Sequence, residues 1–160
     1  MQTNLSMPFL NCGKVFKVNL PKELTNNESP INLAAVKVNT RKIEMPCILV
    51  NYSQNLEFEV SGLNPTLSIL YRLVRRSNYT RKVRVLEEWN FRGSEIFPTV
   101  VQDDISTIEP LVLNFCDCLE DNSDEPLIYI LQIKEIVTNN TTFNITNQEI
   151  SAIASSGESE

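Results

Sequence analysis

The stretch PLVLNFCDCLEDNSDEPLIYILQIKEIV, residues 110–137, indicates most about the fold of this chain. It predicts two β-strands joined by an acidic loop, because apolar residues alternate in its first part and cluster in its last part. Leu111, Leu113 and Phe115 share one face of the first strand, since strand side chains alternate with period two. Cys116 and Cys118 share the other face. If the Leu/Phe face is the core, both sulfurs point outward, where a partner can reach them.

Similar runs of strand length occur along the rest of the chain. Residues 66–76 and 81–91 flank a short polar turn and are typical of a long β-hairpin. In its second arm Trp89 shares a face with Val83, Val85 and Phe91, so Trp89 is expected in the core. The other expected strands are 15–20, 31–39, 47–52, 56–60, 96–101 and 141–150. This pattern, with no helical periodicity, predicts an all-β fold: a jelly roll or β-sandwich of about 8–10 antiparallel strands.

The length of 160 residues fits one domain with a sizeable core. We expect residues 1–13 to form a flexible N-terminal arm that ends near Cys12, because they are polar and precede the first clear strand. Residues 14–153 form the single β-domain. Residues 154–160, ASSGESE, are small and polar and are expected to be a disordered tail.

Composition excludes several classes of function. The chain contains no histidine, which removes Ser-His-Asp and Cys-His catalytic pairs and the usual zinc-hydrolase ligands. Its four glycines are isolated, so no phosphate-binding loop is present. The net charge of −6 argues against nucleic acid as a partner. No apolar run approaches the roughly 20 residues of a membrane helix, and no signal peptide is recognisable. We expect no cofactor and no enzymatic activity.

The four cysteines, Cys12, Cys47, Cys116 and Cys118, leave three interpretations open. A structural zinc site usually needs two CxxC-like pairs, and the chain has one CxC and two single cysteines. Free buried thiols are the ordinary state inside cells. Disulfides are favoured, and the outward sulfurs favour bonds between chains. A Cys116–Cys118 bond is disfavoured, because residues i and i+2 of a strand lie ~6.5–7 Å apart, at the limit of disulfide reach.

Charged residues concentrate in two segments. The loop 117–125 is acidic, but it lacks the spacing and the glycine of an EF-hand, so a solvated loop is favoured over a calcium site. The hairpin around Tyr79 is basic, which suits a solvated edge, a polyanion site, or contact with the acidic loop of a neighbouring copy. The candidate assembly residues are Arg72, Arg75, Arg76, Asp117, Glu120 and Asp121.

Two weaker patterns are present. Paired carboxylates could serve glycoside hydrolysis, but nothing in the sequence selects two of the twenty acidic residues. Several N-x-S/T sequons occur, and in so asparagine-rich a chain we interpret them as coincidental.

Five segments together resemble a poorly characterised family of clostridial cysteine-containing β proteins. They are 10–13 (LNCG), 46–53 (PCILVNYS), 71–75 (YRLVR), 88–91 (EWNF) and 115–118 (FCDC). FCDC is the most specific of them. Members of that family carry further cysteines after it, which are missing at 120–125, so the family's full cysteine network does not transfer to this chain.

The arrangement is also similar in design to endospore-appendage fibre subunits, which are jelly rolls that stack through a cysteine-bearing N-terminal arm. This resemblance implies a structural subunit of an extracellular or spore-surface filament. Residues 1–13 would dock on a neighbouring copy and Cys12 would bond to Cys116 or Cys118 there. Cys47 would pair with the sulfur that is left. The alternative is a carbohydrate- or polyanion-binding β-sandwich that uses the hairpin 71–84.

Overall fold

The computed structural model describes residues 7–79, 82–93, 97–120 and 125–157. In this part of the chain the regular structure consists almost entirely of β-strands. They are β1 Phe9–Cys12, β2 Lys14–Val15, β3 Ile31–Val38, β4 Pro46–Leu63, β5 Thr66–Ser77, β6 Val83–Arg92, β7 Val100–Cys118, β8 Leu127–Asn139 and β9 Thr141–Ser156. No described helix is long and apolar enough to cross a membrane.

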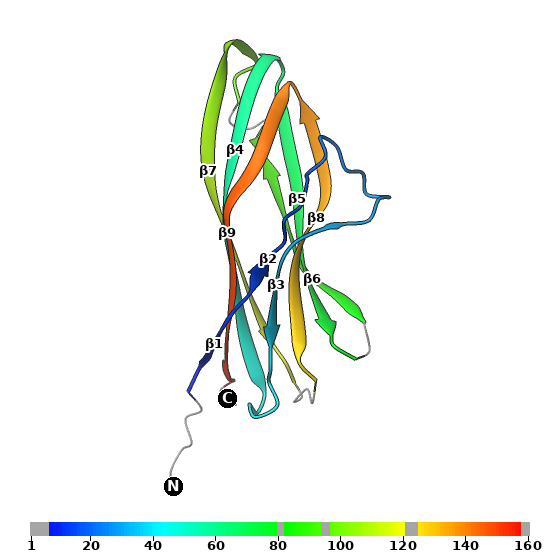
Figure 1. Ribbon diagram of the computed structural model, residues 1–160, viewed down its shortest axis with the longest axis vertical. Coiled ribbons are helices and arrows are strands. Elements are labelled where there is room, and N and C mark those ends of the chain that lie inside the picture. The colour runs from blue at the N-terminus through cyan, green and yellow to red at the C-terminus, as the bar shows by residue number, and fades with distance from the viewer. Residues whose placement is uncertain (1–6, 80–81, 94–96, 121–124, 158–160) are drawn as a thin grey trace.

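The strands form two antiparallel sheets packed face to face (Figure 1). Sheet A has the order β1-β9-β4-β7 and sheet B the order β2-β3-β8-β5-β6. From β3 to β9 the described chain crosses between the sheets at every connection except β5–β6. This winding is that of a jelly roll, with β2 as an extra short strand at one edge. The all-β prediction is therefore confirmed.

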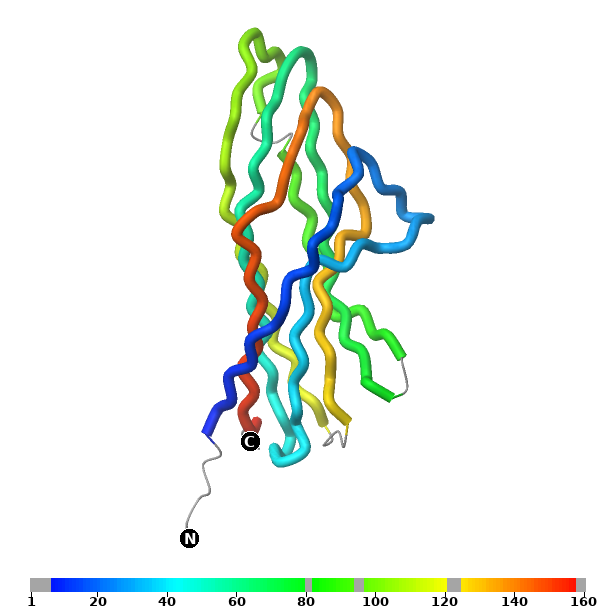
Figure 2. Tube along the Cα trace, viewed as in Figure 1, coloured from blue at the N-terminus to red at the C-terminus, as the bar shows by residue number. Residues whose placement is uncertain are grey.

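The N-terminal segment joins the two sheets (Figure 2). β1 pairs with β9 in sheet A, and β2 pairs with β3 in sheet B. Gly13 lies at the crossing, where its N–H donates to the carbonyl of Ile150 at 2.8 Å. A Cβ atom here would lie 2.4 Å from the carbonyl oxygen of Ala35, so the crossing requires glycine. The described part of the expected flexible arm is thus largely a paired edge strand, because the backbone of β1 pairs with β9.

Several strands begin or end at other residues than the sequence predicted. The expected strands 47–52 and 56–60 are one strand, β4. The polar segment 102–107 belongs to β7, because its backbone pairs with β4 while its side chains remain largely exposed. β9 continues to Ser156 with Ala154 buried, so the described start of the expected tail is strand. Conversely, the expected strand 15–20 is regular only in β2.

The predicted hairpin is confirmed as β5–β6, but the face of its second arm changes part-way. A register shift between Leu73 and Val74 leaves Leu86 without a direct partner on β5. Such a β-bulge reverses which residues face the core. Trp89 and Leu86 therefore pack against the core as partly buried residues, while Val83 and Val85 are exposed. The expectation for Trp89 was right, and the shared face with Val83 and Val85 was wrong.

Candidate functional site

A disulfide joins the start of β4 to the end of β7 at the outer face of sheet A. Cys47 and Cys118 are direct cross-strand partners, with Cα atoms 4.0 Å apart and a bond between their sulfurs. Cα atoms lie this close in non-hydrogen-bonded antiparallel pairs. This bond lies within the chain, and it leaves Cys12 and Cys116 as the free, exposed thiols.

Cys116 lies beside this disulfide. Its Sγ is 4.0 Å from Sγ of Cys118, which is two residues further along the same face of β7. Leu111, Leu113 and Phe115 alternate with these cysteines and pack against the core. The prediction that Cys116 and Cys118 point away from the core is therefore confirmed. Three sulfurs consequently share one exposed patch.

The second free thiol, Cys12, lies at the opposite edge of the same sheet. Cys12 pairs with Ser151, which pairs with Asn51, which pairs with Asn114 of β7. Three strand spacings separate β1 from β7, or about 14 Å. A disulfide needs Cα atoms within about 7 Å. Cys12 and Cys116 of one chain therefore cannot bond to each other in this fold.

An apolar row links the two edges across the outer face of sheet A. Leu10 of β1 pairs with Ile153, which pairs with Leu49, which pairs with Cys116. All three apolar residues are exposed, Leu10 to 65%. On β7 the apolar surface continues with Ile108 and Val112, which are 61% and 65% exposed. Exposed apolar residues on unpaired edge strands are typical of surfaces that meet another chain.

Arg75 and Asp117, two of the candidate assembly residues, bind each other inside the chain. Arg75 Nη1 donates to Asp117 Oδ2 at 2.5 Å, and the Tyr129 hydroxyl donates to the same oxygen at 2.8 Å. Asp117 is buried because it continues the inward face of Phe115. Sequence reasoning placed it in the acidic loop, although the period-two alternation already indicated the core face. This pair is therefore not available to a neighbouring chain.

The other charged candidates differ in their exposure. Arg72 donates to Gln132 Oε1 at 3.0 Å through Nη2 and is partly buried. Glu120 is exposed, and Asp121 lies outside the described residues. Glu125, also in the acidic loop, accepts bonds from the Ser77 hydroxyl and from the N–H of Tyr79. The basic hairpin thus meets the acidic segment of its own chain.

Arg76 contributes to a basic cavity of about 420 Å³ on the β2–β3–β8 side of the molecule. Lys14 and Lys37 supply two further positive charges, and Cys12 lies at its border. The apolar part of the lining comes from Phe16, Ala35, Ile128 and Ile130. This cavity brings together basic residues from β2, β3 and β5, which the sequence scatters over more than sixty positions. It suits an acidic group attached to an apolar one.

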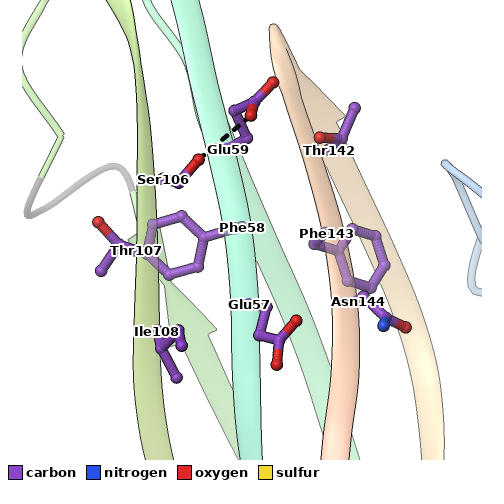
Figure 3. A pocket seen from close by; sticks show the side chains of 9 residues that line it. All are labelled: Glu57, Phe58, Glu59, Ser106, Thr107, Ile108, Thr142, Phe143 and Asn144. Carbon is purple, nitrogen blue, oxygen red and sulfur yellow. Dashed lines mark hydrogen bonds between the residues drawn. The ribbon is translucent and has the colours of Figure 1, made fainter.

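A second cavity, of about 490 Å³, lies on sheet A (Figure 3). Three consecutive residues from each of β7, β4 and β9 line it, including the carboxylates Glu57 and Glu59. Glu57 accepts a hydrogen bond from Thr146 at 2.7 Å, and Glu59 accepts one from Ser106 at 3.2 Å. Both carboxylates project from one strand, two residues apart. Each of them is held by a hydroxyl group of a neighbouring strand.

The sequence also left open a structural zinc site, which usually needs two pairs of cysteines. Among the described residues, no group of three histidine, cysteine, aspartate or glutamate side chains could hold a metal ion. The sulfur patch itself holds one bonded pair and one thiol.

Buried tyrosines form a polar layer inside the sandwich that sequence reasoning missed. The Tyr52 hydroxyl lies 2.7 Å from Gln54 Oε1, and Gln54 Nε2 donates to the Tyr71 hydroxyl at 2.6 Å. Burial raises the pKa of Tyr52 and of Tyr71 well above the usual value for tyrosine. Burial, together with the Asp117 charge, does the same for the pKa of Tyr129. The sequence did contain a signal for this layer: the even-numbered residues of β4 alternate as an inward face, and Gln54 is one of them.

These pKa values predict a loss of stability in alkaline solution. The unfolded tyrosines ionise near pH 10, while the folded ones stay protonated, so the folded state binds more protons above that pH. The free energy of unfolding should be unaffected below about pH 10 and fall above it, by about 1.4 kcal/mol per pH unit for each of the three tyrosines. Urea unfolding at several pH values, with tyrosinate absorbance as a second probe, measures this. Ionisation of the three tyrosines before unfolding would contradict it.

A family model described as "Domain of unknown function (DUF4489)" matches residues 7–155, nearly the whole chain. No curated protein matches.

Proposed function

The chain belongs to the family of the domain of unknown function DUF4489, and we propose that it is a structural subunit that self-assembles into an extracellular or spore-surface filament through its N-terminal segment. The observation that carries this proposal is the position of the two free thiols. Each chain presents one exposed thiol at each edge of sheet A, too far apart to bond within the chain. Links between Cys12 and the Cys116 of another copy would leave a free thiol at each end and could continue indefinitely.

The strand directions support a simple way to join the copies. β1 and β7 run in opposite directions, because three successive antiparallel pairings separate them. A second copy in the same orientation would therefore bring its β7 antiparallel to β1, with both outer faces on the same side. Among the strands that the structure describes, β1 and β7 are the edges of sheet A, each with one unpaired side. Such a contact would continue sheet A from one subunit to the next.

The cysteines fit this contact when the copies are staggered. Within one chain, successive cross-strand pairs connect Cys12 of β1 to Asn114 of β7. Cys116 lies two residues further along β7. Placing Cys12 opposite the neighbour's Cys116 shifts the copies by two residues, or about 7 Å along the strands. Strand twist adds a rotation at each step. The proposed assembly is a helical filament, locked by one disulfide per contact.

The intrachain disulfide supports the proposed location outside the cell. Disulfides persist in oxidising compartments and are rare where glutathione and thioredoxin keep thiols reduced. Cys47–Cys118 closes a loop of 71 residues, and such a bond typically stabilises a domain by about 2–4 kcal/mol.

Denaturing electrophoresis of the native protein with and without reductant tests this proposal. We expect a ladder of bands without reductant that collapses to a single band near 18.2 kDa with it. Mass spectrometry of the ladder should identify Cys12 joined to Cys116 of another chain, with Cys116→Ser protein as the matched control. Filaments should be visible by electron microscopy. A single monomer band in both lanes, together with no filaments, would contradict the proposal.

The basic cavity favours a second candidate function, binding of a polyanion or an acidic carbohydrate. Lys14, Lys37 and Arg76 converge there, whereas Arg75 of the same hairpin is held by Asp117. Reversing the charge of Arg76 and Lys14 should then abolish binding of a sulfated polysaccharide without changing the oligomeric state. Equal binding by that variant would exclude this candidate.

A further inference from the structure

The outer face of sheet A holds a free thiol next to a disulfide. Sγ of Cys116 and Sγ of Cys118 are 4.0 Å apart, and Cys118 is bonded to Cys47 on the neighbouring strand. Cys116 and Cys118 are both exposed, and Cys47 is partly exposed. A thiolate in contact with a disulfide sulfur can exchange with it, because the reaction needs only the attacking thiolate and access to the bond.

We propose that Cys47, Cys118 and Cys116 form a thiol–disulfide exchange unit that passes the subunit's own disulfide to the Cys12 of a neighbouring copy. This inference rests on the proposed filament function for its last step. It assigns a role to the intrachain bond beyond stabilising the fold: the bond supplies the oxidation state that the link between subunits requires.

The first step takes place within one chain. The thiolate of Cys116 attacks Sγ of Cys118, so a Cys116–Cys118 bond forms while the Cys47–Cys118 bond breaks. Cys47 leaves as a thiolate and takes up a proton. The new bond joins residues i and i+2 of a strand, whose Cα atoms lie roughly 6.5–7 Å apart, at the limit of disulfide reach. It is therefore a reactive intermediate, since strained and exposed disulfides are the labile ones.

The second step joins two chains. The thiolate of the neighbour's Cys12 attacks Sγ of Cys116, a Cys12–Cys116 bond forms, and Cys118 leaves as a thiolate that takes up a proton. One intrachain disulfide has been replaced by one interchain disulfide. Two thiols are consumed, at Cys12 and Cys116, and two appear, at Cys47 and Cys118. No electrons are gained or lost, so no external oxidant is needed.

Cys116 is better placed than Cys47 or Cys118 to form the bond to a neighbouring copy. Cys116 is the exposed cysteine of β7 that is not bonded, and Leu49, its direct partner on β4, presents an apolar surface beside it. Leu10 of the β1 edge lies in this same apolar row. In the staggered contact, a neighbour's Cys12 would lie opposite Cys116 and its Leu10 opposite Cys118, so that strand would bring a thiol and an apolar residue to the sulfur patch together.

The test uses two chains that cannot polymerise. The donor carries Cys12 alone, with Cys47→Ser, Cys116→Ser and Cys118→Ser. The acceptor is the Cys12→Ser variant with its intrachain disulfide formed. The control acceptor also carries Cys47→Ser and Cys118→Ser, so that Cys116 is present without the disulfide. Should the donor fail to fold, a Cys116→Ser chain with its disulfide intact replaces it. Each pair is mixed anaerobically, without oxidant, and again with diamide.

Without oxidant, we expect the acceptor to form a Cys12–Cys116 dimer while the total count of free thiols stays constant. Differential alkylation and mass spectrometry should show Cys47 and Cys118 newly free in the dimer. The control acceptor should form the dimer only with diamide. The relay is overturned if the acceptor also needs diamide, or if Cys47 and Cys118 remain bonded in the dimer; the filament proposal survives both results. If neither pair forms a dimer with diamide, the filament proposal fails and the relay with it.

Discussion

An equimolar mixture of Cys12→Ser and Cys116→Ser chains is expected to form covalent dimers and nothing larger, whereas the unaltered chain forms a ladder. Each variant keeps one half of the proposed contact. A link between Cys116 of the first variant and Cys12 of the second leaves neither chain with an unused cysteine of the Cys12–Cys116 contact, so growth stops. Either variant alone should remain monomeric, because its free thiol has no matching partner at the opposite edge.

This result separates a head-to-tail contact from a symmetric one. In a symmetric contact the same surface of both copies meets, so one cysteine would face its own equivalent. The Cys12→Ser chain would then still form a Cys116–Cys116 dimer by itself. Non-reducing electrophoresis of the two variants, alone and mixed in the presence of diamide, measures this. A Cys47→Ser/Cys118→Ser chain is the matched control, because it loses two sulfurs but keeps Cys12 and Cys116 and should still form a ladder. Dimers from one variant alone would contradict the head-to-tail filament.

Replacing Asp117 with alanine is expected to cost about 3–5 kcal/mol of unfolding free energy, the usual cost of removing one partner of a buried ion pair. The change leaves the guanidinium of Arg75 unpaired where its side chain is only 16% exposed. It also removes the acceptor of the Tyr129 hydroxyl. Urea unfolding gives the result as a lower midpoint at an unchanged slope.

The matched control is Glu120→Ala, which removes an exposed carboxylate three residues away and should change stability by less than about 0.5 kcal/mol. A double variant, Arg75→Met with Asp117→Leu, should recover most of the loss, because it removes both charges together. If Asp117→Ala were as stable as Glu120→Ala, the pair would not hold the two sheets together as described. This experiment also separates folding from assembly, because the side chains of Arg75 and Asp117 are largely buried and do not face a neighbouring copy.

Both experiments concern the same end of the molecule. β1, the end of β9, the β3–β4 turn and the end of β7 lie together there (Figure 1). The disulfide fixes β4 to β7 on the outside of sheet A, and the Arg75–Asp117 pair joins β7 to β5 across the core. The edge strand β7, which carries Cys116, is thus linked to β4 on its outer face and to β5 on its inner face. The proposed contact would therefore join a thiol on a strand held by the disulfide and the ion pair to a thiol on the short strand β1.

The sequence alone was sufficient for the class of fold and for the faces of individual strands. Alternation with period two is a local property, so it placed Leu113 and Phe115 inward and both cysteines of β7 outward. The same rule also places Asp117 inward, between the two cysteines, although the sequence analysis counted that residue with the acidic loop. It failed in β6, where the bulge at Leu86 reverses the alternation and exposes Val85.

Only the tertiary structure decided which distant residues meet. Cys47 and Cys118 bond because β4 and β7 are neighbours in one sheet, and Arg75 reaches Asp117 because β5 and β7 face each other across the core. Strand order depends on non-local pairing, for which no local pattern in the chain provides a signal. The same holds for Cys12: the sequence shows a polar segment ending in a cysteine, but only the pairing of β1 with β9 places that thiol at the far edge from Cys116. That separation prevents a bond between the two thiols within the chain, and the proposed assembly depends on it.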